Sequence, residues 1–530
     1  MTTTTTRFYY ILFLIFVFCG FLVYAQIITS FFLSDDFISL YEIRNVSPFW
    51  TAAQGPFFRP LLSLSLICDH TMWSLNATGY HATNIIIHSI NSYLVFLITI
   101  LLLNTSSSHE KRTWTLALLS GFIFLILPSH TEAVAWISGR TDVIAAFFCI
   151  LSFYLYLLYK QHSKVWYVPI SILLFFCALL SKESVIALPF VILAYEVYSY
   201  CIKRTNSRNR TSVLYVPLLY CCALALYLLT RFAVIGTIIG GYGGGKVHLN
   251  VHLLRIFRNV FFYSMRTFLP PMPDMFTIVL IFIGIVSVVI LLIAWSASRW
   301  SLRIPTILYF LAIAFIISLV PVINLGISLI TTQGERFIYL PSLFFSILMI
   351  VVLDYIIRNR RYFTIVFICL FLFYGVSIYF ANKNWRTAGS ISKQILYSLK
   401  AIEGADRLFI INLPDNTHGA YIYRNGIREA LSLFGNTDQF KNVITISFNN
   451  VYDMDDVVEV QERFGLYSVR LLNPRASFIR FSKPQKGDTD SGSFEIENAE
   501  KRSFDLRLKN LNHNDKLVYY SSGIMELYRF

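Results

Sequence analysis

The stretch FFLSDDFISL, residues 31–40, places two adjacent carboxylates, Asp35 and Asp36, directly after the first long apolar run of the chain, residues 8–33. A run of about 20 apolar residues is enough to cross a bilayer, so these acids are expected where the chain leaves the membrane. Ionisable groups beside hydrocarbon are costly, and such positions are candidates for function. The alternative is a pair of solvated loop acids.

The composition is that of a polytopic membrane protein. Of the 530 residues, 56% are hydrophobic and only 14% are charged, and the mean hydropathy is +0.60. Soluble domains carry about 25% charged residues. The net charge of +14 does not indicate nucleic-acid binding, because many of the Lys and Arg residues lie in short loops between apolar runs. The 8 cysteines show no metal-site spacing and no disulfide framework.

Hydropathy and length predict about eleven membrane spans. The polar, aromatic stretch 34–80 is expected to be a loop, the Gly-rich segment 236–246 a flexible loop, and residues 252–270 a segment along the membrane interface. The predicted spans cover residues 8–33, 83–103, 115–129, 140–159, 165–181, 185–200, 212–234, 276–297, 304–324, 337–357 and 363–381.

The loops between these runs predict the orientation. With a cytoplasmic N-terminus, every basic cluster falls on the cytoplasmic side, as the positive-inside rule expects. The opposite, outer side then receives Asp35, Asp36, the Gly-rich loop and the C-terminal region. The basic clusters lie at 111–112, 160–164, 203–210, 299–303 and 358–361.

The composition changes near residue 385, where apolar runs become short. The segments DRLFIINL (406–413), KNVITISF (441–448) and ASFIRFS (476–482) predict strands, and GIREALSLF (426–434) predicts a short helix. The sequence therefore predicts a transmembrane domain over 1–384 and a soluble extracytoplasmic domain over 385–530. The expected fold class is a polytopic α-helical membrane protein with a C-terminal mixed α/β domain.

Polar side chains gather on the predicted outer side. The spacing of His81, Asn84, His88 and Asn91 puts them on one helix face. For His88 and Asn91 we favour hydrogen bonding between helices over a role in a site. Arg59 lies within the stretch 34–80, between prolines and aromatic residues. The other charged candidates stand at the ends of apolar runs, where the alternative is an ordinary charged span end; they are His130, Glu132, Arg140, Lys182, Glu183, Glu335 and Arg336.

Acids and cations between apolar helices suit one reaction class. A carboxylate can deprotonate an acceptor hydroxyl as a general base. Cations can neutralise a phosphate leaving group, and Arg contacts phosphate in a bidentate manner. The apolar helices can hold a lipid tail. The pattern indicates transfer from a polyprenyl-phosphate carrier to an acceptor outside the membrane.

Six motifs carry a resemblance to a known family. They are, in order, the DD pair, FRPL, GYHATNIIIHSINSYLVF, HTEAVAWISGRTDVIAAFF, SKESVIALPF and ERFIYLPS. Together they resemble the GT-C membrane glycosyltransferases, most closely the membrane part of the transmembrane and TPR-containing protein O-mannosyltransferases and their bacterial relatives. The resemblance covers about residues 30–390. The chain departs from the animal family because a different outer domain stands in place of the TPR repeats.

The resemblance implies a polyprenyl-phosphate sugar donor, typically mannose, and inverting transfer to a hydroxyl of a protein or glycan acceptor. It implies Asp35 or Asp36 as the catalytic base and Arg336, Lys182 and Arg59 as ligands of the donor phosphate. It also implies that no metal is obligatory, while leaving a divalent metal open. The residues expected to position the acceptor or donor are His130, Glu132, Arg140, His81, Glu183 and Glu335.

Two other functions remain open at this point. The same scaffold could serve a lipid- or glycan-modifying sugar transferase or an oligosaccharide ligase, or a transporter of lipid-linked sugar. A transporter is expected to show duplicated halves with broken helices, and none is visible. The ending of the chain carries no ER-retention signal and the outer side no cysteine framework, which favours a bacterial inner membrane with the C-terminal domain in the periplasm.

Overall fold

The computed structural model describes residues 3–45, 53–54, 57–103, 110–202, 212–238, 253–272, 274–300, 305–402, 404–435, 440–482 and 494–528. The chain forms two compact units. The first contains Met1–Ala25, Ser47–Ser74 and Gly79–Ala381, and the second contains Gln26–Val46, Leu75–Thr78 and Asn382–Phe530. The predicted basic segments 203–210 and 301–303, and the Gly-rich loop from residue 239 onward, lie outside the described residues.

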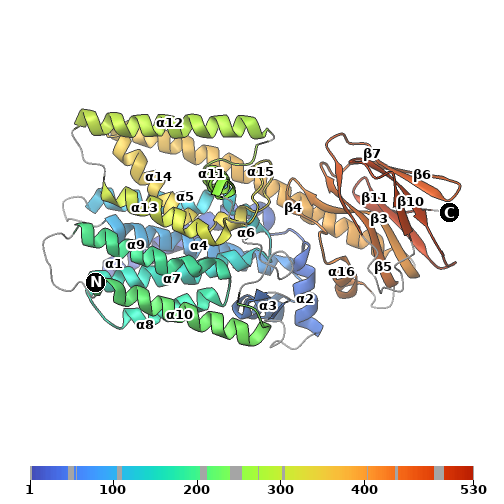
Figure 1. Ribbon diagram of the computed structural model, residues 1–530, viewed down its shortest axis with the longest axis horizontal. Helices are drawn as coiled ribbons and strands as arrows, with labels where there is room; N and C mark the ends of the chain where they lie inside the picture. The colour runs from blue at the N-terminus through green and yellow to red at the C-terminus, as the bar shows by residue number, and fades with distance from the viewer. Residues whose placement is uncertain are drawn as a thin grey trace. The chain divides into compact units, whose positions relative to one another are not determined.

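The first unit is helical, and helices such as α7, α9 and α13 lie alongside one another in it (Figure 1). Every predicted apolar run contains a helix, because a long apolar segment in lipid must satisfy its backbone hydrogen bonds within itself. These helices are α1 (Thr3–Val23), α4 (Ala77–Leu103), α5 (Glu110–Ile126), α7 (Arg140–His162), α8 (Tyr167–Leu179), α9 (Leu188–Ile202), α10 (Ser212–Ile235), α12 (Met275–Trp300), α13 (Thr306–Leu319), α14 (Ser342–Ile356) and α15 (Arg360–Lys400).

Within the described ranges, 6 helices are long and apolar enough to cross a membrane, or up to 7 if the bent pair Glu110–Ile126 and Pro128–Ala135 forms one span. Shorter apolar helices are found at Arg7–Val23, Tyr167–Leu179, Thr306–Val322 and Ser342–Ile356. These helices indicate an integral membrane protein. The count of about eleven spans stays a prediction.

The prediction of a loop over 34–80 is wrong, because the stretch contains two helices, α2 (Asp35–Asn45) and α3 (Pro60–Trp73). Pro60 occupies the first turn of α3, where its missing N–H is not needed. Asp35 and Asp36 stand in the first turn of α2, where acids interact favourably with the helix dipole.

Short elements connect the long helices. The stretch 252–270 forms a helix, α11 (Leu253–Phe268), and its position along a membrane interface stays a prediction. The other short elements are the helix α6 (Thr131–Ala135), the strand pair β1 (Ala53–Gln54) and β2 (Phe57–Phe58), and the 3-10 helices η1 (Ala25–Ile27), η3 (Pro128–His130), η4 (Glu183–Ala187), η5 (Val320–Val322) and η6 (Glu335–Ile338).

The second unit is built on two β-sheets. One has the order β12-β11-β3-β5-β8 with β4 beside β3, and β3 is parallel to both β5 and β11; the other is antiparallel, β6-β7-β10-β9. The elements are β3 (Ala405–Thr417), β4 (Ala420–Tyr421), α16 (Ile427–Phe434), β5 (Phe440–Val451), β6 (Val458–Arg463), β7 (Leu466–Leu471), β8 (Ser477–Phe481), β9 (Phe494–Glu497), β10 (Ser503–Leu508), β11 (Lys516–Ser521) and β12 (Ile524–Leu527).

The core of this unit lies between the sheets. Phe409 and Ile411 of β3 pack in one cluster with Phe504 and Leu506 of β10. Their spacing of two residues puts each pair on one face of its strand. The three predicted strands are confirmed as β3, β5 and β8, and the predicted helix is confirmed as α16.

Candidate active site

The two predicted catalytic acids differ in accessibility. The side chain of Asp36 is buried, and its Oδ2 accepts a hydrogen bond of 2.9 Å from the backbone N–H of Leu33. Asp35 is partly exposed, and its Oδ1 accepts a hydrogen bond of 2.9 Å from the side-chain amide of Asn425. Of the two carboxylates, Asp35 is therefore the more accessible.

The segment after β4 holds the acidic motif in place. The backbone N–H of Ser34 donates to the carbonyl of Ile422 at 2.8 Å, and the ring of Phe37 stacks on Tyr423 with centroids 5.4 Å apart. Gly426 has φ +86°, and a Cβ at this position would lie 2.5 Å from the carbonyl oxygen of Ser34. Only glycine fits this approach.

Asn425 was missed by sequence reasoning. Its one local signal is the Asn-Gly pair at 425–426, which is typical of a turn and says nothing about a distant acid.

In the first unit the predicted cations lie against acids. Nη2 of Arg59 lies 2.9 Å from Glu183, whose other oxygen lies 2.7 Å from the buried Arg231. Nζ of Lys182 lies 2.5 Å from Asp142. The low dielectric around buried charges makes such pairing necessary.

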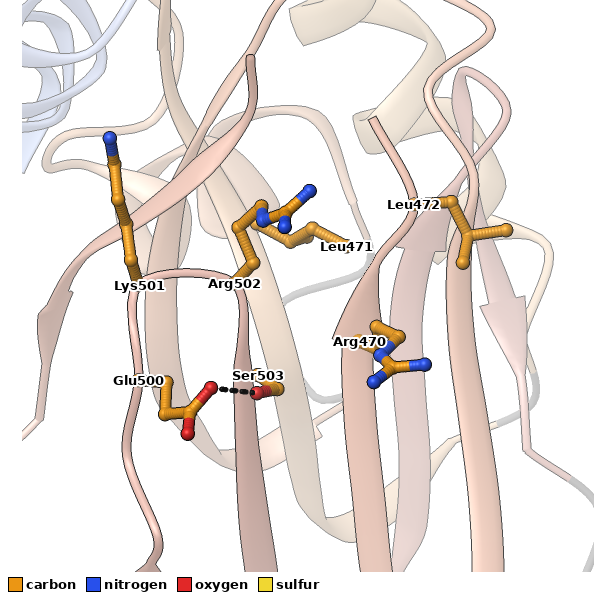
Figure 2. A pocket seen from close by; sticks show the side chains of 7 residues that line it. All are labelled: Arg470, Leu471, Leu472, Glu500, Lys501, Arg502 and Ser503. Atoms are coloured by element: carbon orange, nitrogen blue, oxygen red, sulfur yellow. Dashed lines mark hydrogen bonds between the residues drawn. The ribbon is translucent and has the colours of Figure 1, made fainter. Parts of the chain in front are cut away.

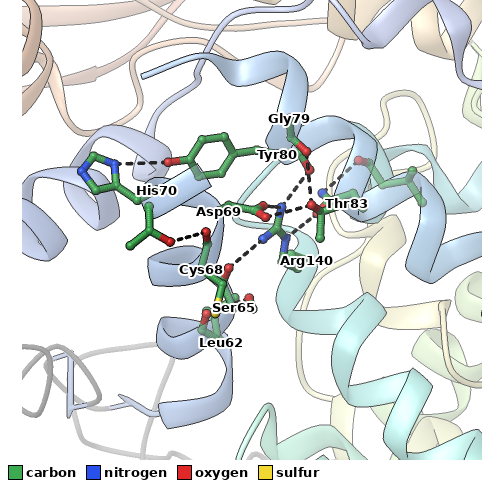
Figure 3. Close-up of polar contacts among 12 residues, drawn as sticks. Leu62, Ser65, Cys68, Asp69, His70, Gly79, Tyr80, Thr83 and Arg140 are labelled. Atoms are coloured by element: carbon green, nitrogen blue, oxygen red, sulfur yellow. Dashed lines mark hydrogen bonds and ion pairs between the residues drawn. The ribbon is translucent and has the colours of Figure 1, made fainter. Parts of the chain in front are cut away.

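Arg140 binds three helices together at a buried position. Its guanidinium forms an ion pair of 2.5 Å with Asp69 of α3, and both side chains are at most 2% exposed. Its Nε donates to Asn84 at 2.5 Å and its Nη2 to the carbonyl of Tyr80 at 2.7 Å, both on α4. Figure 3 shows the contacts of this guanidinium with Asp69 and Tyr80. The hydroxyl of Thr83 donates to the same Asp69 at 2.8 Å.

Arg336 lies on an aromatic surface. Its guanidinium carbon lies 4.7 Å from the ring centroid of Trp136, and its backbone N–H donates to the buried Glu132 at 3.0 Å. The guanidinium itself lies 3.7 Å from Glu132, and 13% of the Arg336 side chain is exposed. Nζ of Lys182 and the guanidinium of Arg336 each lie 5.2 Å from the ring centroid of Phe337. The structure therefore brings two of the three predicted phosphate ligands to one ring.

The histidines belong to a buried network. Nε2 of His130 lies 2.6 Å from the hydroxyl of Ser342, and Nδ1 of His88 lies 2.7 Å from the hydroxyl of Tyr339. The side-chain amide of Asn91 donates to the same hydroxyl at 3.1 Å. Both side chains of α4 also bond to neighbouring helices: Nε2 of His88 lies 3.1 Å from the carbonyl of Leu125 in α5, and the amide of Asn91 donates to the carbonyl of Val143 in α7 at 3.0 Å. Hydrogen bonding between helices is therefore confirmed for His88 and Asn91.

The other predicted residues are buried as well. Glu335 forms a short ion pair with Arg266, and both side chains are fully buried. His81 is also buried. The sequence-based set of site residues omitted Asp69, Asp142, Arg231 and Arg266, which are partners of its members. Arg231 stands in the largely apolar helix α10, and that is the signal that could have found it; α11, which holds Arg266, carries two further arginines and offers no such signal.

Among the described residues, no group of 3 or more His, Cys, Asp and Glu side chains could hold a metal ion.

The second unit has its own pocket, of about 570 Å³, between the end of β7 and the start of β10. Figure 2 shows Glu500 accepting a hydrogen bond from Ser503, near Arg470 and Arg502. With Lys501, this pocket has three cationic side chains and one acid, which suits an anionic ligand.

No family model matches the chain. It is 31% identical to protein O-mannosyl-transferase TMTC1 of Homo sapiens over 162 residues, which are 29% of this chain and 18% of the relative. It is 34% identical to Tmtc1 of Drosophila melanogaster over 132 residues, 24% of this chain and 14% of the relative. It is 32% identical to human TMTC2 over 147 residues, which are 27% of this chain and 16% of the relative. The matches thus span less than a fifth of each relative, and over this part the chain is similar to protein O-mannosyl-transferases, which confirms the resemblance that its motifs indicate.

Proposed function

We propose that this protein is a membrane glycosyltransferase that moves a sugar from a polyprenyl-phosphate carrier to a hydroxyl group of a protein. The names of the relatives, all protein O-mannosyl-transferases, support the reaction class, the protein acceptor and mannose as the sugar. The apolar helices support a membrane-embedded lipid donor.

The observation that carries the proposal is the setting of Arg336. The ring of Trp136 lies against the guanidinium of Arg336, and the carboxylate of Glu132 accepts a hydrogen bond from the backbone N–H of Arg336. Part of the Arg336 side chain remains exposed. A planar guanidinium held in this way is suited to bidentate contact with phosphate. Lys182, beside the same Phe337 ring, adds positive charge for the leaving phosphate.

Asp35 is the proposed base. Its carboxylate takes the proton of the acceptor hydroxyl, and the hydroxyl oxygen forms a bond to the anomeric carbon. The bond from that carbon to the phosphate oxygen breaks, and polyprenyl phosphate leaves with its electron pair. Attack on the face opposite the leaving group inverts the anomeric configuration. Asn425 positions Asp35 through its hydrogen bond, and Asp36 holds the turn at Leu33.

The orientation belongs to the proposal as well. We place the N-terminus in the cytoplasm and the reaction on the outer side of a bacterial inner membrane, with the C-terminal domain in the periplasm. The basic clusters at 111–112, 160–164 and 358–361 support this orientation.

The experiment is a transfer assay in membranes with radiolabelled polyprenyl-phosphate mannose. Asp35→Asn should lower the turnover at least about 100-fold, the effect of removing a general base. Arg336→Ala should raise the KM for the donor about 10- to 100-fold, because a charge-assisted contact contributes about 1.5–3 kcal/mol. Matched controls are Asp455→Asn and Arg361→Ala, which change exposed side chains of the same type.

Each outcome bears on a separate part of the proposal. Full activity in Asp35→Asn would show that the base is another residue. An unchanged donor KM in Arg336→Ala would remove Arg336 from the phosphate site. If the wild-type protein transfers no label, mannose is the wrong sugar or the protein is a carrier of lipid-linked sugar.

A further inference from the structure

The helices α5 and α14 each have one end near His130, on the predicted outer side. A second candidate site lies at the opposite ends of these two helices. α5 has 17 residues, about 25 Å in an α-helix, and leads to His130 just beyond its C-terminal end. α14 begins at Ser342, which contacts His130. The start of α5, the end of α14 and the start of α15 together enclose a groove of about 380 Å³, here called the basic groove.

The rim of the basic groove is positively charged. Arg112, Arg358 and Arg360 line it, and among the described residues that line it the only acid is Asp354. Nη2 of Arg112 lies 2.6 Å from Asp354, and Nε of the same side chain also donates to that carboxylate. The side chains of this pair are 46% and 21% exposed, and Arg358 and Arg360 are exposed too. Of the charged side chains that line the groove, three are guanidiniums and one is a carboxylate, so the described lining is predominantly basic.

The wall of the basic groove is apolar. Leu119, Phe363 and Phe367 line it, and all three pack against the apolar core of the helical unit. Along α15 the apolar surface continues beyond the groove, since Ile365 and Ile368 are 56% and 50% exposed. A ligand that fills this groove would therefore meet cations at one end and hydrocarbon at the other.

We propose that the basic groove binds an anionic phospholipid. The phosphate diester contacts the guanidiniums of Arg358 and Arg360, and an acyl chain lies against Phe363 and Phe367. Charge complementarity supports this occupant, because an anionic lipid brings net negative charge to a lining in which guanidiniums outnumber carboxylates, and a zwitterionic lipid does not. Basic pockets between helices at a membrane surface bind anionic headgroups in this way. The site is separate from the proposed reaction and does not depend on it.

The test uses the full-length protein in detergent and measures lipid binding by native mass spectrometry. The probes are dioctanoyl phosphatidylglycerol, dioctanoyl phosphatidylcholine and farnesyl phosphate. Arg360→Ala should weaken phosphatidylglycerol binding about fivefold, the effect of one basic residue near a lipid headgroup. The double variant of Arg358→Ala with Arg360→Ala should weaken it about 25-fold.

The matched control is Arg361→Ala, which removes an exposed arginine next to Arg360 that does not line the groove. It should change the affinity less than twofold. Equal losses in Arg360→Ala and Arg361→Ala would overturn the proposal in favour of a general surface field. Equal binding of the two phospholipids would overturn headgroup recognition. Tighter binding of farnesyl phosphate, lost in Arg360→Ala, would mean that the groove holds the carrier lipid instead.

Discussion

Removing one partner of the Arg140–Asp69 ion pair should destabilise the protein more than any surface substitution. In Asp69→Asn the guanidinium of Arg140 stays buried while its counter-charge, 2.5 Å away, is lost. Breaking a buried pair from one side costs about 3–5 kcal/mol. This corresponds to roughly two to four orders of magnitude in the ratio of folded to unfolded protein.

The assay is thermal unfolding of the purified protein in detergent, at one heating rate because unfolding of large proteins is often irreversible. Asp69→Asn should lower the midpoint by several degrees. The matched control is Glu495→Gln, which breaks an ion pair with Lys509 whose side chains are 53% and 41% exposed. Exposed pairs contribute about 0–1 kcal/mol, so the midpoint of this variant should barely move.

A double-mutant cycle separates the ion pair from other effects. In the background of Arg140→Met, Asp69 is a buried carboxylate without its cation, so Asp69→Asn should cost nothing or stabilise the protein there. The reasoning would be refuted if Asp69→Asn lowered the midpoint equally in both backgrounds, or if it left the wild-type midpoint unchanged.

Two further predictions concern the acidic motif. Asn425→Ala removes the 2.9 Å hydrogen bond to Asp35; since a hydrogen bond to a charged group contributes about 1.5–3 kcal/mol, turnover in the mannose-transfer assay should fall about tenfold or more. The KM for the donor should stay constant, and a change in this KM alone would contradict the positioning role. Asp36→Ala should lower the thermal midpoint, because the buried N–H of Leu33 loses its acceptor. Transfer per folded molecule should persist, and its complete loss at an unchanged midpoint would identify Asp36 as the base instead.

In this protein, many helices and strands could be predicted from the pattern of apolar and polar residues within each segment. Long apolar runs predicted the helices α1, α4, α5, α7, α8, α9, α10, α12, α13, α14 and α15, because a helix is the only conformation that satisfies the backbone of an isolated segment in lipid. In the C-terminal region, strand-forming segments predicted β3, β5 and β8 in the same way. The failure over 34–80 is also local in origin, since α2 and α3 have only 11 and 14 residues and are shorter than the run of about 20 apolar residues that predicts a membrane span.

The sequence by itself thus determined the helices of the long apolar runs, the strands β3, β5 and β8, and the motifs that resemble the mannosyltransferases, because all of these depend on neighbouring residues. Only the tertiary structure decided the partners of the charged residues. Asp69 and Arg140 lie on different helices. Asn425 donates a hydrogen bond to Asp35, although the two residues are 390 positions apart in the sequence. Such pairs depend on which surfaces pack together, and a buried charge takes whichever partner packing brings within reach.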